Sequence, residues 1–218
     1  MIVRNLANLI SLLGVLPVCV LFLDDGYRYI LPLIVFNNVM DDLDGIVAVK
    51  LKIKSVFGAA LDNVCDAVSH TVFVLTVGMN HSWVGGFALV AATAILIRVV
   101  SRLVPGATLG AGSPTNELIR HMFFVLLLEE LFSFRAEFVL MAVFSLHTVS
   151  LLLPYRMPGL IRSLTKSAFS IALVNVALVV AWLFPHVAPV AALAFGSTYL
   201  YGLVFGGLKS FKALSSSE

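Results

Sequence analysis

The sequence has few charged residues and few cysteines for its length. Only 12% of its 218 residues are charged and 60% are hydrophobic, whereas a soluble domain carries about 25% charged residues. Too little polar surface remains to coat a water-soluble fold, so that class is excluded. The two cysteines, Cys19 and Cys65, lie within apolar segments and provide neither a disulfide framework nor a zinc site. A formal net charge of +2 is too small to indicate a nucleic-acid partner.

What the sequence does contain is a series of long apolar segments. A transmembrane helix needs about 20 apolar residues, because each residue rises about 1.5 Å through about 30 Å of hydrocarbon. The segments predict an all-α polytopic membrane bundle, a single domain over 1–218, with about eight helices and six as the alternative. They cover Leu6–Leu23, Arg28–Met40, Phe57–Met79, Trp83–Val104, Glu117–Phe132, Phe138–Pro154, Thr165–Phe184 and Val187–Leu208. The fifth contains Arg120, His121, Glu129 and Glu130, so a short or tilted segment is the alternative there.

The basic residues are distributed unequally between the two ends of these segments. With eight spans and an internal N-terminus, all 14 Lys and Arg residues except Arg28 and Arg135 fall on one side. The positive-inside rule therefore places the N-terminus and the loops after the second, fourth and sixth spans in the cytoplasm.

Four aspartates occur where an ionisable side chain costs about 2.5–3.5 kcal/mol to insert. Asp41 and Asp44 share one helix face at the end of the second segment, and Asp62 and Asp66 share one in the third. The connection between the segments is short, so the two helices can pack together and gather four carboxylates. Divalent cations would relieve their repulsion, and an all-oxygen site suits Mg²⁺ or Mn²⁺. A solvated helix end or a capping role explains any one of them better than all four, and Asp42, which faces away, is expected to be solvated.

The spacing of these aspartates resembles the signature of the CDP-alcohol phosphatidyltransferases, D-x2-D-G-x2-A-R-x8-G-x3-D-x3-D. The matching positions are Asp41, Asp44, Gly45, Ala48, Gly58, Asp62 and Asp66. One position departs from it, because Val49 stands where the family has arginine, followed by Lys50. Lys50 can supply a charge, but it lies about 100° further round the helix and lacks the planar guanidinium.

The resemblance implies an enzyme that transfers a phosphatidyl group from CDP-diacylglycerol to a small polar alcohol and releases CMP. It implies two Mg²⁺ or Mn²⁺ ions on Asp41, Asp44 and Asp62, with Asp66 as the general base and a further metal contact. The nucleotide pocket would lie at Gly45, Ala48, Gly58 and Lys50. For the two glycines, close packing between helices is an equal alternative. A homodimer in the inner membrane of a bacterium, with its active site facing the cytoplasm, is also implied.

Looser resemblances favour L-serine as the acceptor alcohol. The segment 61–69, the loop Gly112–Pro114 and the region from Val149 to Arg156 are similar to parts of phosphatidylserine synthases. Phosphatidylcholine synthases share the aspartate motif, so choline is the alternative acceptor and would need aromatic faces such as Tyr155 or Phe57.

A serine carboxylate needs a cation, which the cytoplasmic arginines can provide. Each of these arginines has a second explanation as a positive-inside anchor or a lipid contact. The candidates for contacts to the acceptor or to phosphate are Arg98, Arg102, Arg120, Arg156, Ser113 and Tyr155.

Two other functional classes are weighed against this one. An ion-coupled transporter would be expected to show paired halves with matching broken helices, and the sequence shows none. An inactive relative is suggested by Val49 alone. His70 follows Asp66 by one helical turn, and we expect it to be a packed neutral histidine.

Overall fold

The computed structural model describes residues 5–104, 106–107, 109–155, 157 and 168–215. Within them the chain forms eight α-helices and three short 3-10 helices, as the all-α prediction requires. The α-helices are α1 Leu6–Val15, α2 Ile30–Lys50, α3 Val56–Asn80, α4 Gly85–Leu103, α5 Thr115–Phe132, α6 Glu137–Leu152, α8 Ala168–Leu183 and α9 Ala188–Ser215. The 3-10 helices are η2 Leu16–Phe22, η3 Gly26–Tyr29 and η4 Pro185–Val187.

Each of the eight apolar segments overlaps one of these helices, but some ends differ from the prediction. Helix α2 continues past Met40 to Lys50, so its aspartates lie inside the helix, and α9 continues past Leu208 to Ser215. An apolar segment ends where polar side chains begin, whereas a helix ends only where its backbone hydrogen bonds stop. The end of the helix and the end of the apolar segment therefore differ wherever the helix continues with polar residues.

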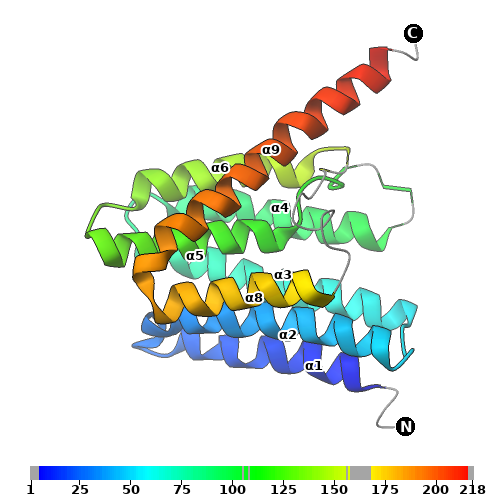
Figure 1. Cartoon of the computed structure of the whole chain (residues 1–218), viewed down its shortest axis with the longest axis horizontal. Coiled ribbons are helices and arrows are strands. Elements are labelled where there is room, and N and C mark those ends of the chain that lie inside the picture. The colour runs from blue at the N-terminus through cyan, green and yellow to red at the C-terminus, as the bar shows by residue number, and fades with distance from the viewer. Residues whose placement is uncertain (1–4, 105, 108, 156, 158–167, 216–218) are drawn as a thin grey trace.

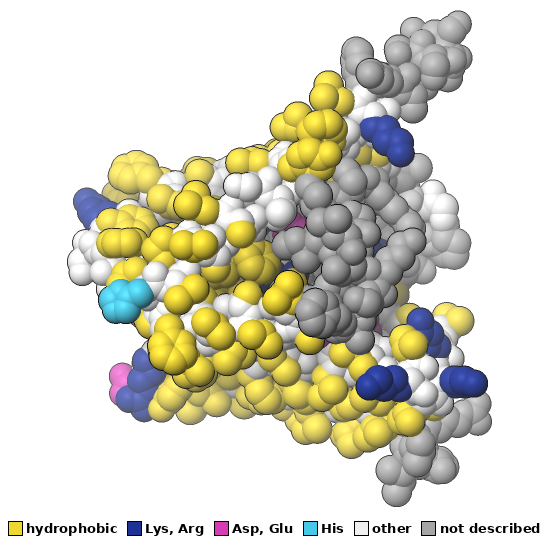
Figure 2. All heavy atoms as spheres, viewed as in Figure 1, with side chains coloured by type: hydrophobic (Ala, Val, Ile, Leu, Met, Phe, Trp, Pro, Cys, Tyr) yellow, Lys and Arg dark blue, Asp and Glu magenta, His cyan; other side chains and the backbone are white. Residues whose placement is uncertain are grey.

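The protein is an integral membrane protein. Among the described residues, α3, α4 and the segment Pro185–Ser210 are long and apolar enough to cross a bilayer, and three shorter apolar helices accompany them. Hydrophobic side chains cover much of the face seen in Figure 2. Phe22, Trp83 and Phe138 are each more than 70% exposed, which a lipid environment accommodates and water does not. That all eight helices cross the membrane stays a prediction.

Helix α5 occupies the centre of the bundle (Figure 1). It contacts α2, α3, α6 and α9, and its side chains from Leu118 to Leu127 are mostly buried. The fifth segment is therefore a full helix of 18 residues. Its central position also explains its polar residues, because Arg120 bonds to α2 and His121 contacts α6 and α9 in place of lipid.

Small residues allow α3 and α4 to approach each other closely. A Cβ atom added at Gly78 of α3 would collide with the Cβ of Ala88 on α4. The buried face of α4 continues with Ala91, Ala92 and Ala94. Such close backbone approach supplies van der Waals contact where lipid tails offer no hydrophobic driving force. This packing fixes α4, and with it Arg98 and Arg102, beside α3.

Candidate active site

A short turn holds α2 and α3 side by side at one end of the bundle. The amide of Ile53 donates to the carbonyl of Ala48 at 3.0 Å, and Lys52 takes a left-handed φ of 55°. The Ser55 hydroxyl then caps α3 by accepting from the amide of Gly58 at 2.9 Å. The chain reverses within these few residues, so the last turns of α2 face the first turns of α3.

Three carboxylates converge across this helix pair. Asp41 of α2 and Asp62 and Asp66 of α3 each offer an oxygen, and these oxygens lie within 4.8 Å of one another. All three side chains are half-buried. Asn116 of α5 donates from Nδ2 to Asp41 Oδ2 at 2.7 Å and orients that carboxylate. A set of carboxylate oxygens at this spacing fits a divalent cation such as Mg²⁺ or Mn²⁺. We call these three aspartates the acidic cluster.

The fourth predicted ligand, Asp44, lies outside the acidic cluster. It is buried, and its carboxylate accepts a hydrogen bond from the hydroxyl of Ser11 on α1. It is nevertheless close enough to repel Asp62 and Asp66 electrostatically. The structure thus brings three of the four predicted carboxylates together and holds the fourth nearby against α1.

Asp42 faces away from the acidic cluster, as predicted, but it is not simply solvated. Asn175 of α8 donates to Asp42 Oδ2 at 2.7 Å, and Asn38 lies 3.4 Å from the same oxygen. Asn38 also donates to Asn175 Oδ1 at 2.7 Å and accepts from Arg120 Nε at 3.0 Å. A polar network therefore links α5, α2 and α8, and Arg120 belongs to it.

Sequence reasoning missed the asparagines Asn38, Asn116 and Asn175. None of the three belongs to the aspartate motif, and their polar neighbours in the sequence do not indicate which helices they contact. The available signal was their type, since an amide within an apolar helix costs free energy unless it finds a partner.

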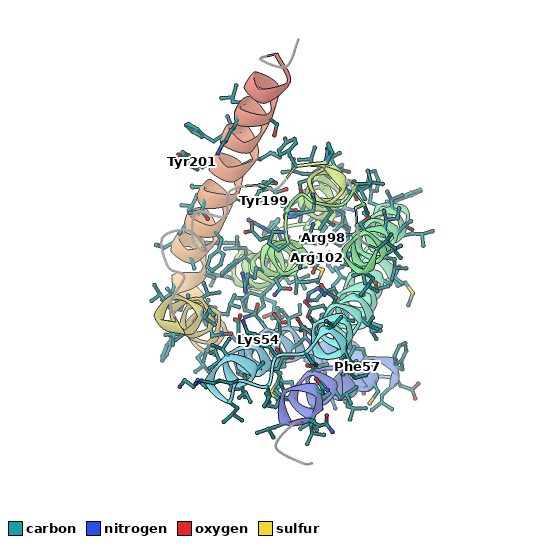
Figure 3. The ribbon with its side chains drawn as sticks, turned by 90° about the vertical axis from the view of Figure 1, so that its right-hand side faces the viewer. Lys54, Phe57, Arg98, Arg102, Tyr199 and Tyr201 are labelled. Atoms are coloured by element: carbon teal, nitrogen blue, oxygen red, sulfur yellow. The ribbon has the colours of Figure 1, made fainter. Side chains whose placement is uncertain are left out.

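A small cavity borders the acidic cluster, and a larger cavity adjoins it. The smaller has a volume of about 90 Å³ and is lined by the three aspartates, and the larger has about 560 Å³. Four residues line both cavities: Asn63, Arg98, Arg102 and Pro114. Figure 3 shows Arg98 and Arg102 of α4 in the interior between the helices. The Arg98 side chain is almost fully buried and donates from Nη1 to the Gly110 carbonyl at 2.6 Å.

The predicted nucleotide-pocket residues lie on the same helix pair but in different surroundings. A Cβ at Gly45 would meet nothing within 4 Å, so no helix packs there. A Cβ at Gly58 would come within 2.9 Å of Asn8 Oδ1 on α1, so this glycine serves helix packing. Ala48 is half-buried, and Lys50 is exposed at the end of α2.

Ser113 and Tyr155 do not line either cavity. Ser113 is fully buried, and its hydroxyl lies 2.8 Å from the hydroxyl of Ser150. The Tyr155 hydroxyl lies beside Gly207 of α9. Arg156 lies outside the described residues. His70 is buried, as expected for a packed histidine.

Comparison with known proteins identifies the family. A family model described as CDP-alcohol phosphatidyltransferase matches residues 4–197, which include the acidic cluster and the lining of both cavities. No curated protein matches the chain. The family match and the three converging carboxylates agree with the function implied by the aspartate spacing. The chain therefore belongs to the CDP-alcohol phosphatidyltransferase family and is an enzyme that transfers a phosphatidyl group to an alcohol.

Proposed function

We propose that this enzyme transfers the phosphatidyl group of CDP-diacylglycerol to the hydroxyl of L-serine and releases CMP. The observation that carries the proposal is the position of Arg98 and Arg102, which line both cavities next to the acidic cluster. The cluster suits a diphosphate with its cations, and the arginines suit an acceptor that carries a carboxylate.

The four aspartates have different proposed roles at the diphosphate. Asp41, Asp44 and Asp62 would hold the divalent cations, two ions in all, and Asp66 would add a contact. A divalent cation bound here would neutralise the diphosphate and stabilise CMP as the leaving group. Asn116 keeps the Asp41 carboxylate oriented, as outer hydrogen bonds do for metal ligands generally.

In the reaction, the serine hydroxyl oxygen attacks the phosphorus that carries diacylglycerol. The bond from this phosphorus to the bridging oxygen breaks, and CMP leaves with the electron pair. Asp66 accepts the hydroxyl proton as the new bond forms. Because a carboxylate beside cations is a weak base, the proton transfer must be coupled to the attack and not precede it.

The lining of the cavities supports serine over choline. A quaternary ammonium is bound best by aromatic faces, and no aromatic side chain occurs among the described residues that line either cavity. Phe57 is exposed on α3 and lies away from the two arginines (Figure 3). Tyr155 lies beside α9. The two aromatic candidates for a choline site are therefore elsewhere.

We propose further that the nucleotide lies along α2 at Gly45 and Ala48, since the backbone at Gly45 faces open space. Lys50 supplies the charge that the family's arginine would bring, since Val49 cannot. The active site faces the cytoplasm of a bacterium, at the end of the bundle that carries the α2–α3 turn and its lysines. A homodimer is proposed from the family alone.

A single assay distinguishes these alternatives. Purified protein is incubated with CDP-diacylglycerol and Mn²⁺ or Mg²⁺, and CMP release is followed with serine, choline, glycerol, glycerol 3-phosphate and inositol. We expect release with serine. Release with choline alone, or with glycerol 3-phosphate alone, would reject serine and keep the class. No CMP release with any acceptor would favour a transporter or an inactive relative.

A further inference from the structure

One wall of the larger cavity is a chain segment held between two helices. Gly110 and Gly112 line the cavity, and the Gly110 carbonyl accepts from Arg98 Nη1 on α4. On the other side, the amide of Ser113 donates to the carbonyl of Ser150, at the end of α6, at 2.9 Å. Gly112 lies so close to that carbonyl that a Cβ there would overlap it. We call residues 110–113 the wall segment.

The Ser150 hydroxyl is the centre of the contacts that hold the wall segment to α6. It donates to the carbonyl of His147 at 3.2 Å and accepts from the hydroxyl of Tyr199 at 2.6 Å. The Ser113 hydroxyl, 2.8 Å away, must then donate to it as well, because Ser150 has one proton to give. Its donor and both acceptor positions are used, and Ser113 and Ser150 are fully buried. Removing one partner therefore leaves one of these buried hydrogen-bonding positions empty.

Tyr199 reaches this centre from α9, the last helix of the described chain. Its side chain is 4% exposed, and its ring stacks on that of His147 with centroids 4.4 Å apart. Figure 3 shows Tyr199 directed into the bundle, whereas Tyr201, which is 44% exposed, lies on the outer side of α9. Tyr199 also falls just beyond residues 4–197, which the family model matches. The family resemblance thus says nothing of this contact.

We propose that Tyr199 is a positioning residue that holds the wall segment, and through it Arg98, in place for the acceptor alcohol. The path runs from the Tyr199 hydroxyl to Ser150, to Ser113, along the backbone to Gly110, and to the guanidinium of Arg98. Each step is a hydrogen bond or a short piece of backbone. The inference rests on the proposed function in one respect, that the larger cavity receives the acceptor.

Tyr199→Phe tests the proposal, since it removes the hydroxyl and keeps the ring stacked on His147. We expect the KM for the acceptor to rise about three- to tenfold, as the loss of one buried hydrogen bond predicts. The kcat should stay within about twofold, because no reacting atom is touched. Ser113→Ala should have a similar effect. The double variant should lose little more than either single one, because both remove the same path.

Tyr201→Phe is the matched control, as it removes a hydroxyl from the same helix on the exposed side. We expect it to behave as the wild type does. Wild-type kinetics in Tyr199→Phe, an equal loss in Tyr201→Phe, or fully additive effects in the double variant would each overturn the proposal. So would a loss confined to kcat or to the yield of folded protein.

Amide hydrogen exchange tests the same proposal without any assay of activity. In detergent-solubilised protein, Tyr199→Phe should speed exchange at the Ser113 amide and leave α2 and α3 unchanged, whereas Tyr201→Phe should change neither. Unchanged exchange in the wall segment would refute the positioning role even if no acceptor were found. If the wild-type protein releases no CMP with any acceptor, the proposed function is wrong. The role of Tyr199 is then tested by the exchange measurement alone.

Discussion

Asp66 brings together the properties that a proton acceptor needs at this site. It lies one helical turn from Asp62, and both offer an oxygen to the acidic cluster. It is half-buried and borders the smaller cavity. Through Arg98 and Arg102 that cavity adjoins the larger one, where we place the acceptor. The same carboxylate can therefore face both the cations and the attacking hydroxyl.

Asp66→Asn should lower kcat at least about a hundredfold, because asparagine preserves the volume but cannot accept a proton. The measurement is steady-state CMP release, with thermal unfolding in detergent to confirm the fold. Asp24→Asn, in the connection at the opposite end of α2, is the matched control and should be fully active. An active Asp66→Asn enzyme would remove Asp66 from its role as base.

Arg102→Ala should raise the KM for serine about ten- to hundredfold, because a charged hydrogen bond contributes about 1.5–3 kcal/mol. The KM for CDP-diacylglycerol should change less, since the acidic cluster remains intact. Arg135→Ala provides the control, as this arginine is exposed between α5 and α6 and bonds only to Glu137 among the described residues. A serine KM that does not move would separate Arg102 from the acceptor.

At this scale, helical periodicity predicted three members of the acidic cluster but also placed Asp44 there, which instead bonds to Ser11. Residues three or four apart share a face, and a short turn pairs the two faces, so Asp41, Asp62 and Asp66 could be placed together. The partners of these groups could not be predicted. Asn116 lies 75 residues from Asp41, and Ser11 lies 33 residues from Asp44. Such pairs depend on which helices pack together, which one sequence does not state.

Among the helices, two glycines show opposite uses of a missing side chain. Gly45 on α2 faces open space, whereas Gly78 on α3 is in tight contact with α4. The first leaves backbone accessible to a ligand, and the second lets two helices approach. From the sequence, either ligand access or helix packing could explain the glycines of the motif. The open space around Gly45 favours ligand access at that position.

Gly45→Leu and Gly78→Leu should therefore fail in different ways. Gly45→Leu should raise the KM for CDP-diacylglycerol with little change in thermal stability, because its side chain would fill the nucleotide's space. Gly78→Leu should lower stability by about 1–3 kcal/mol or prevent folding, because the α3–α4 contact has no room. Steady-state kinetics and thermal unfolding measure the two effects. A Gly45→Leu protein with lower stability and unchanged KM would show that Gly45 serves packing.

Helix positions were predictable because apolar segments of adequate length leave few alternatives to a helix in lipid. Helix ends were less predictable than helix positions, because α2 continues through its aspartates to Lys50. The polar fifth segment was ambiguous for a physical reason. A central helix contacts other helices and needs less hydrophobic surface than one facing lipid, and the position of α5 became clear only from the packing.

For the whole molecule, the account requires that the α2–α3 turn face the cytoplasm. In a variant without Cys19 and Cys65, a new cysteine at Lys52 should react with a membrane-impermeant maleimide only after spheroplasts are permeabilised. A new cysteine at Asp24 should react in intact spheroplasts, because α2 separates the two positions. The cysteine-free protein is the control and should not react. The reverse pattern of labelling would invert the topology and expose the acidic cluster to the wrong side.

The most direct measurement is Mn²⁺ binding to the purified protein, followed by electron paramagnetic resonance with and without CDP. The central claim is that carboxylates of α2 and α3 jointly hold divalent cations for a diphosphate. The account predicts that the wild type binds Mn²⁺ and that CDP strengthens the binding. Asp62→Asn should weaken it at least about tenfold, and Asp24→Asn should not. Equal Mn²⁺ affinity in the wild type and in Asp62→Asn would contradict the account.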